Sequence, residues 1–147
     1  MKFSAVVLAT AAATGAIADT VFDVTGFSAG CKEVTIWCTY RFTIEPGTID
    51  SQRYDCFANP ENVGFGELTD TKDGTCHPPS RTFEIVRSDE GFTLTVSAQT
   101  SPDSPDSVIK GSYLIPNEDF ETVKRDGLQE ASEVYIGSGN FALERVN

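Results

Sequence analysis

The segment from residue 34 to residue 44 alternates apolar and polar side chains, and this alternation constrains the fold more than any other stretch. The positions of one parity are apolar or cysteine: Val34, Ile36, Cys38, Tyr40, Phe42 and Ile44. The positions between them are mostly polar: Thr35, Trp37, Thr39, Arg41 and Thr43. Successive side chains of a strand point to opposite faces of its sheet, so the pattern indicates a strand with one buried face.

Shorter runs of the same kind follow, each bounded by turn residues. They predict strands over residues 20–27, 53–58, 81–86, 92–98 and 108–115, and a last hairpin over residues 133–137 and 140–146. Residues 117–124 suit a short helix or an edge strand, and residues 59–79 are expected to form a long loop pinned by Cys76. We therefore predict an all-β domain, a compact antiparallel β-sandwich or barrel-like sandwich of about seven or eight strands.

The first 18 residues have the layout of a secretory signal peptide. Met1-Lys2 supplies a positive charge, residues 3–13 are apolar but too few to span a bilayer, and Ala16-Ile17-Ala18 is a small-x-small cleavage site. We expect cleavage before Asp19. The mature protein would then be a secreted, extracellular, single β domain over residues 19–147.

The charge balance excludes two classes of partner. The chain has 22 acidic and 11 basic residues, which gives a net charge of −11. An acidic protein is repelled by nucleic acid and by anionic lipid, so we expect neither nucleic-acid binding nor electrostatic docking to a membrane. We also expect no membrane insertion, because no segment after the predicted leader is apolar and long enough to cross a bilayer. The charge suits solubility in an extracellular medium or attraction to a basic partner.

Four cysteines follow the predicted leader, at Cys31, Cys38, Cys56 and Cys76, and an even number in an exported chain predicts two disulfides. Cys38 and Cys56 both lie on the apolar faces of neighbouring predicted strands, which favours Cys38–Cys56 and leaves Cys31–Cys76. The alternative is Cys31–Cys38 with Cys56–Cys76. The spacing does not fit a zinc site, so we expect no metal and no cofactor.

Catalytic chemistry finds little support in the sequence. A serine or cysteine nucleophile needs a histidine base, and His77 is the only histidine. A glycosidase needs two carboxyl groups across a cleft, and Glu84, inside a predicted strand, is expected to face solvent instead. We therefore expect a protein that is not an enzyme, with a small glycan-active enzyme as an alternative.

Aromatic and basic residues on predicted exposed positions are the candidates for partner binding. Trp37 and Arg41 lie on the less apolar face of their strand. On the next predicted strand, Phe57 points to the face opposite that of Cys56, and Phe65 lies between two glycines. Tryptophan and arginine are favoured at the centres of protein interfaces. These four residues form the predicted contact surface.

Several stretches together resemble the small cysteine-bearing secreted proteins of filamentous fungi, including the Alternaria major-allergen-like family. The resemblance covers roughly Asp19 to Ala98 and lies in the order of cysteines and strands, in FSAGC (27–31), CTYRF (38–42), YDC (54–56), Cys76 and FTLTV (92–96). It implies a compact β-barrel or sandwich and a secreted effector or elicitor that binds a host extracellular protein or a cell-wall glycan. The alternatives are a carbohydrate-binding module and a hydrolase inhibitor that uses residues 59–79 as its bait.

Overall fold

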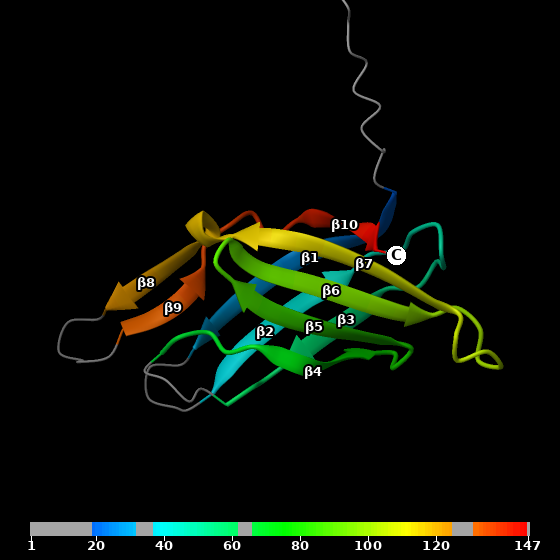
Figure 1. Cartoon of the computed structure of the whole chain (residues 1–147), viewed down its shortest axis with the longest axis horizontal. Coiled ribbons are helices and arrows are strands. Elements are labelled where there is room, and N and C mark those ends of the chain that lie inside the picture. Colours follow the sequence, from blue (N-terminus) through cyan, green and yellow to red (C-terminus); the bar gives the residue numbers. More distant parts are fainter. Residues whose placement is uncertain (1–18, 32–36, 62–65, 125–130, 147) are drawn as a thin grey trace, which may run out of the picture.

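A computed structural model describes residues 19–31, 37–61, 66–124 and 131–146, and the predicted signal peptide lies outside them. Eight strands close into an antiparallel barrel (Figure 1). They are β1 (Thr20–Cys31), β2 (Cys38–Ile44), β3 (Tyr54–Ala58), β4 (Thr71–His77), β5 (Arg81–Ser88), β6 (Gly91–Gln99), β7 (Val108–Pro116) and β10 (Phe141–Val146). The prediction of an all-β, barrel-like sandwich is confirmed.

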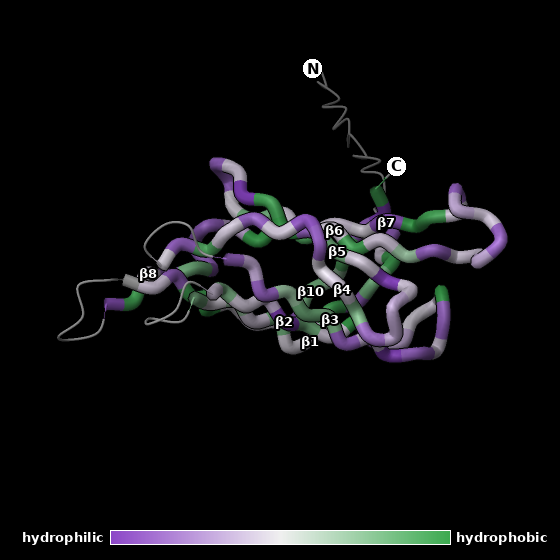
Figure 2. The backbone as a smooth tube through the Cα atoms, turned by 90° about the horizontal axis from the view of Figure 1, so that it is seen from below, coloured by the Kyte–Doolittle hydropathy of each residue, from purple (hydrophilic) through white to green (hydrophobic). Residues whose placement is uncertain are grey.

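The barrel is an up-and-down meander from β1 to β7, which β10 closes by pairing with both β7 and β1. Seen from below, the barrel is flattened, with β1, β2 and β3 in one wall and β5, β6 and β7 in the other (Figure 2). No helix among the described residues is long and apolar enough to cross a membrane.

The interior of the barrel is filled by side chains of the inward parity. Alternation along β2 buries Cys38, Tyr40, Phe42 and Ile44, as predicted. Phe42 meets Phe83 of β5 edge to face, with ring centroids 4.8 Å apart. The largest fully buried side chains come from both walls: Tyr40, Phe42, Ile85, Phe92, Leu94, Ile115 and Leu143. This packed core is the product of the alternation.

Strand β4 lies inside the segment predicted to be a long loop, so that prediction is wrong. Its inward residues are Thr71, Gly74 and Cys76, which carry almost no hydrophobic signal. Gly74 is required there because an added Cβ would lie 2.5 Å from the Phe83 ring. Because β4 occupies Thr71–His77, these residues are not part of the free loop that the hydrolase-inhibitor alternative assumed.

The C-terminal hairpin is also different from the prediction. The short helix η1 (Asn117–Asp119) leads into β8 (Phe120–Lys124), so both options for residues 117–124 occur in part. Strand β8 pairs with β9 (Ala131–Tyr135), whereas β10 leaves this hairpin and pairs with β1 and β7. The expected pairing of residues 133–137 with residues 140–146 is therefore wrong.

Aromatic contacts and one charged cluster attach the β8–β9 hairpin to the barrel. The rings of Phe27 and Tyr135 have centroids 4.8 Å apart, and those of Phe92 and Phe120 lie 4.7 Å apart. Glu133 pairs with Arg87 of β5 and accepts a hydrogen bond from the backbone N–H of Leu68. The cluster thus joins the end of β5 to β9 and to the segment before β4.

The disulfides are Cys31–Cys38 and Cys56–Cys76, so the favoured pairing was wrong and the alternative is correct. Cys31 lies opposite Cys38 in the β1–β2 register, and Cys56 lies opposite Cys76 in the β3–β4 register. The residue that faces Cys56 on β2 is Phe42. Cys38 lies four positions from Phe42, which is roughly 13 Å along the strand. Sharing an inward face is therefore not sufficient for two cysteines to meet.

The close approach of Gly74 to Phe83 yields a stability prediction. Gly74→Ala should lower the free energy of unfolding by about 1–3 kcal/mol, because the Phe83 ring is packed in the core and has no space to move. Gly47→Ala is the matched control, since its added Cβ would meet no atom within 4 Å. Urea unfolding of both variants measures the difference, and equal stability would contradict this packing.

Candidate binding surface

The outer face of β2, β3 and β4 presents side chains in two registered rows. Arg41, Phe57 and Thr75 lie opposite one another in one row, and Thr43, Asp55 and His77 lie opposite one another in the next. The alternation that buries Cys56 and Cys76 turns these neighbours outward. We call this surface the Phe57 face and define it by Trp37, Thr39, Arg41, Thr43, Asp55, Phe57, Asn59, Thr75 and His77.

Phe57 is the exposed aromatic at the centre of this face. Its exposed fraction is 43%, which is unusual for a phenylalanine on a regular strand. The Arg41 guanidinium lies over the ring, 5.4 Å from its centroid, in the geometry of a cation–π contact. The pair therefore offers apolar area and a positive charge at one point.

Hydrogen bonds orient polar groups on both sides of that pair. The Thr43 hydroxyl donates to Asp55 Oδ1 at 2.9 Å, and the Thr39 hydroxyl donates to Asn59 Oδ1 at 3.1 Å. Both contacts cross from β2 to the β3 segment, because Thr43 lies opposite Asp55 and the same register brings Thr39 to Asn59. They hold a carboxylate and an amide at set positions beside the ring.

Two shallow hollows flank Phe57. One, of about 380 Å³, is lined by Arg41, Thr43, Asp55 and Phe57, together with Phe42 and Cys56. The other, of about 440 Å³, lies toward β4 and is lined by Phe57, Ala58, Asn59, Pro60, Asp70, Thr71, Lys72, Asp73 and Thr75. Phe57 lines both hollows, so the two adjoin at this side chain.

Trp37 lies at the end of the same face. It precedes β2, forms an isolated bridge with Glu61 and has an exposed fraction of 40%. It shares its parity with Arg41, which is roughly 13 Å farther along the strand. The structure thus brings three predicted contact residues, Trp37, Arg41 and Phe57, to one surface, whereas Phe65 lies outside the described residues.

The sequence prediction missed the contribution of β4 to this face. Lys72, Asp73 and Thr75 line the second hollow because β4 pairs with β3. The only pattern that could have predicted this strand is the short alternation Thr75-Cys76-His77, in which Cys76 is the single residue expected to point inward. Glu84, considered for glycosidase chemistry, is exposed on β5, as expected.

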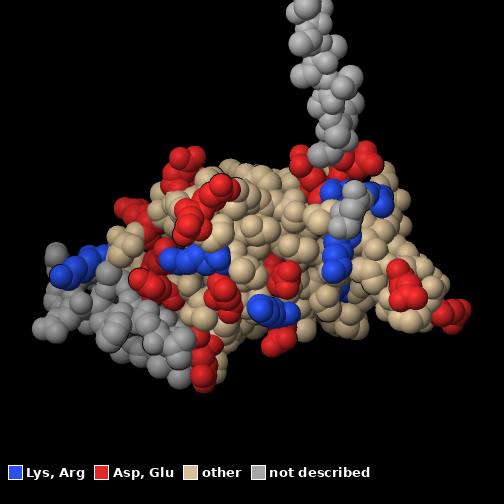
Figure 3. All heavy atoms as spheres, viewed as in Figure 1, with Lys and Arg blue, Asp and Glu red and all other residues tan. Residues whose placement is uncertain are grey.

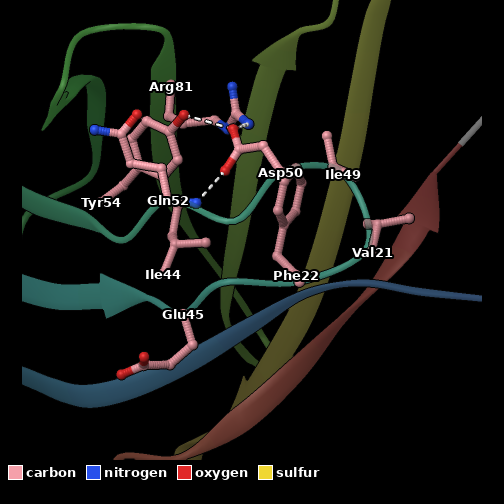
Figure 4. A pocket seen from close by; sticks show the side chains of 10 residues that line it. Val21, Phe22, Ile44, Glu45, Ile49, Asp50, Gln52, Tyr54 and Arg81 are labelled. Carbon is pink, nitrogen blue, oxygen red and sulfur yellow. Dashed lines mark hydrogen bonds and ion pairs between the residues drawn. The ribbon is translucent and has the colours of Figure 1, made fainter.

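A second cluster lies in a small pocket formed with the loop that joins β2 to β3. Figure 4 shows the Asp50 carboxylate between the Tyr54 hydroxyl and the Arg81 guanidinium. Asp50 Oδ2 is 2.7 Å from Arg81 Nη2 and accepts a hydrogen bond from the Tyr54 hydroxyl at 2.6 Å. Arg81 also lies over the Tyr54 ring, 4.4 Å from its centroid. The pocket, of about 10 Å³, has room for roughly one water molecule.

This cluster fixes the loop between β2 and β3 to the barrel. Burial acts to raise the pKa of Asp50, but hydrogen bonds from Tyr54 and from the backbone of Gln52, together with the Arg81 charge, lower it below the usual value. The Arg81 side chain is only 5% exposed, so its charge depends on Asp50 for compensation. No group of three metal-ligating side chains occurs within the described parts of the chain.

Comparison with known proteins adds no relative: no family model, no curated protein sequence and no solved structure matches this chain. Function must therefore be inferred from the chain's own residues.

The Asp50–Arg81 pair yields the second prediction. Asp50→Asn should lower the free energy of unfolding by about 2–3 kcal/mol near neutral pH, because the buried Arg81 loses its counter-charge. Glu84→Gln, a change of an exposed carboxylate, is the control and should shift it by less than about 0.5 kcal/mol.

The effect of Asp50→Asn should also depend on pH. The pKa of Asp50 is lowered in the folded protein, so its contribution is present above the usual carboxyl pKa of about 4 and is lost as pH falls through the lowered value. Denaturant unfolding at several pH values should show the difference from wild type shrinking in acid. A difference that grows in acid would contradict this assignment.

Proposed function

We propose that this chain is a secreted, non-enzymatic protein that acts by binding an extracellular partner through the Phe57 face. The observation that carries the proposal is the exposed Phe57 ring, paired with Arg41 and standing between two hollows. Aromatic residues and arginine are enriched where protein interfaces bind most strongly. The first candidate partner is a host extracellular protein, consistent with an effector or elicitor.

The rigidity of the scaffold supports a binding role. Cys56 and Cys76 join β3 to β4 directly beneath the row that carries Phe57, and Cys31–Cys38 fixes the start of β2. A surface held on hydrogen-bonded and cross-linked strands loses little conformational entropy when a partner docks. Two disulfides are also compatible with an oxidising extracellular location.

Glu45 and Asp50 do not suit the role of a glycosidase acid. A glycosidase acid requires a carboxyl group whose pKa is raised. The pKa values of Glu45 and Asp50 are instead both lowered. Hydrogen bonds from Thr25 and Arg53 lower the pKa of Glu45.

A cell-wall glycan is the second candidate partner, and a separate observation favours it. Each hollow combines the Phe57 ring with hydroxyl, amide or carboxylate groups, such as Thr43, Asp55 and Asn59. A sugar ring presents an apolar face for stacking and hydroxyl groups for hydrogen bonds, so this combination suits a carbohydrate-binding surface.

Phe57→Ala should weaken partner binding at least about tenfold, which corresponds to about 1.4 kcal/mol. Leu114→Ala is the matched control, because Leu114 is a similarly exposed apolar residue, on β7 across the barrel. Immobilised wild type and variants would be tested against extracellular fluid of a candidate host, with bound proteins quantified by mass spectrometry. Soluble wild type and variants would be co-sedimented with insoluble cell-wall polysaccharides.

The two arms distinguish the candidates. Proteins retained by wild type and Leu114→Ala but lost in Phe57→Ala would support a protein partner, whereas the same pattern with a polysaccharide would support the glycan. Equal binding by Phe57→Ala and wild type in both arms would overturn the assignment of this face.

A further inference from the structure

The loop between β6 and β7 contains two copies of the same tripeptide. Ser101-Pro102-Asp103 is followed directly by Ser104-Pro105-Asp106, and Ser107 completes the pattern. The loop projects from the end of the barrel (Figure 1). It makes no contribution to the Phe57 face.

Each copy forms a hydrogen-bonded turn of the same kind. The backbone N–H of Ser104 donates to the Ser101 carbonyl at 3.3 Å, and that of Ser107 donates to the Ser104 carbonyl at 3.0 Å. Proline occupies the second position of each turn, where its fixed φ angle is favourable. Thr100 closes the base of the loop, because its N–H and its hydroxyl both donate to the Ser107 carbonyl.

Within the described part of the chain, no hydrogen bond uses the serine hydroxyls at the start of the two turns. The prolines and aspartates of both turns are exposed, and the serines are half-buried. Among the described residues, Ser101 and Ser104 use only their backbone groups in hydrogen bonds. Their Oγ atoms are therefore chemically available at the projecting end of a well-formed loop.

We propose that Ser101 and Ser104 are sites of O-linked glycosylation by a neutral hexose. Serine next to proline in an exposed segment is the composition typical of O-glycosylated regions. In the reaction, Ser Oγ bonds to the anomeric carbon of a phosphate-activated hexose, whose phosphate-bearing group leaves as the hydroxyl loses its proton. The proposal rests on the secretion inferred above, because such transferases act in the secretory pathway.

The local charge favours a sugar over a phosphate. Asp103 and Asp106 already make the loop acidic, and residues 99–109 contain neither lysine nor arginine. Figure 3 shows acidic side chains, without basic ones, at the projecting tip on the right. A phosphate would add negative charge with no lysine or arginine inside the loop to pair with, whereas a hexose adds no charge.

The position of the loop is compatible with partner binding. In the closed barrel, β7 lies four strands from β3 in either direction. The loop leaves the barrel at its end, where the Gln99 N–H donates to the Ser80 carbonyl at 3.5 Å, so a glycan there would extend from the end of the barrel rather than from the outer surface of β3 (Figure 1).

The test is peptide mapping of the full chain secreted by a eukaryotic host that carries out O-glycosylation. Electron-transfer fragmentation should place hexose on Ser101 or Ser104, and intact mass should show whole-hexose increments. Ser101→Ala/Ser104→Ala should lose the increments, whereas Ser51→Ala, which alters an exposed serine without a following proline, should retain them.

Each outcome decides the proposal. Unmodified Ser101 and Ser104, hexose only at other residues, or phosphate at these serines would each overturn it. Because the wild-type peptide map is read directly, the result does not depend on whether the variant folds. An unmodified loop in a secreted protein would leave the binding proposal intact, and a glycosylated loop would not establish it.

Discussion

The pairing of β10 with both β1 and β7 is the interaction on which the rest of the structure depends. Phe22 lies opposite Leu143 and Val24 opposite Phe141 on one side of β10, and Glu144 lies opposite Ser112 on the other. Without these pairings, β1 and β7 would be open edges with unpaired backbone groups, and one side of the core would face water. Closure removes both edges and makes the inward face of every barrel strand a shared interior.

Closure also determines where function can lie. The interior is packed with aromatic and aliphatic side chains, so groups that meet a partner must be on the outer parity of the strands or in the loops. The Phe57 face lies directly outside the Cys56–Cys76 bridge, where β3 and β4 are covalently joined. The inward residues of β2, β3 and β4 thus supply part of the core and the Cys56–Cys76 disulfide, and the outward residues of the same strands supply the candidate surface.

The sequence predicted the class of fold because alternation is a local property. It placed Tyr40, Phe42 and Cys56 inward and Arg41 and Phe57 outward, and the structure confirms all five. Register is not local, and this is why the favoured disulfides were wrong: Cys38 and Cys56 share a face but lie four positions apart in the ladder.

The missed elements have equally physical causes. Strand β4 buries Thr71 and Gly74, whose pattern does not differ from that of a loop. It is a strand because it pairs with β3 and β5, and Gly74 leaves the space that the Phe83 ring occupies. The partner of β10 could not be read from turn spacing, because β10 pairs with the first strand of the chain. The contact between Arg41 and Phe57 likewise depends on the β2–β3 register.

The single tryptophan allows the central claim to be tested directly, because Trp37 lies on the Phe57 face. Protein labelled with 5-fluorotryptophan gives one fluorine resonance, and an unlabelled partner adds none. Addition of the partner captured by the wild-type protein should shift or broaden this resonance, and Phe57→Ala should weaken the response. Binding confirmed by sedimentation with an unchanged Trp37 resonance would show that the partner docks elsewhere and would contradict the account.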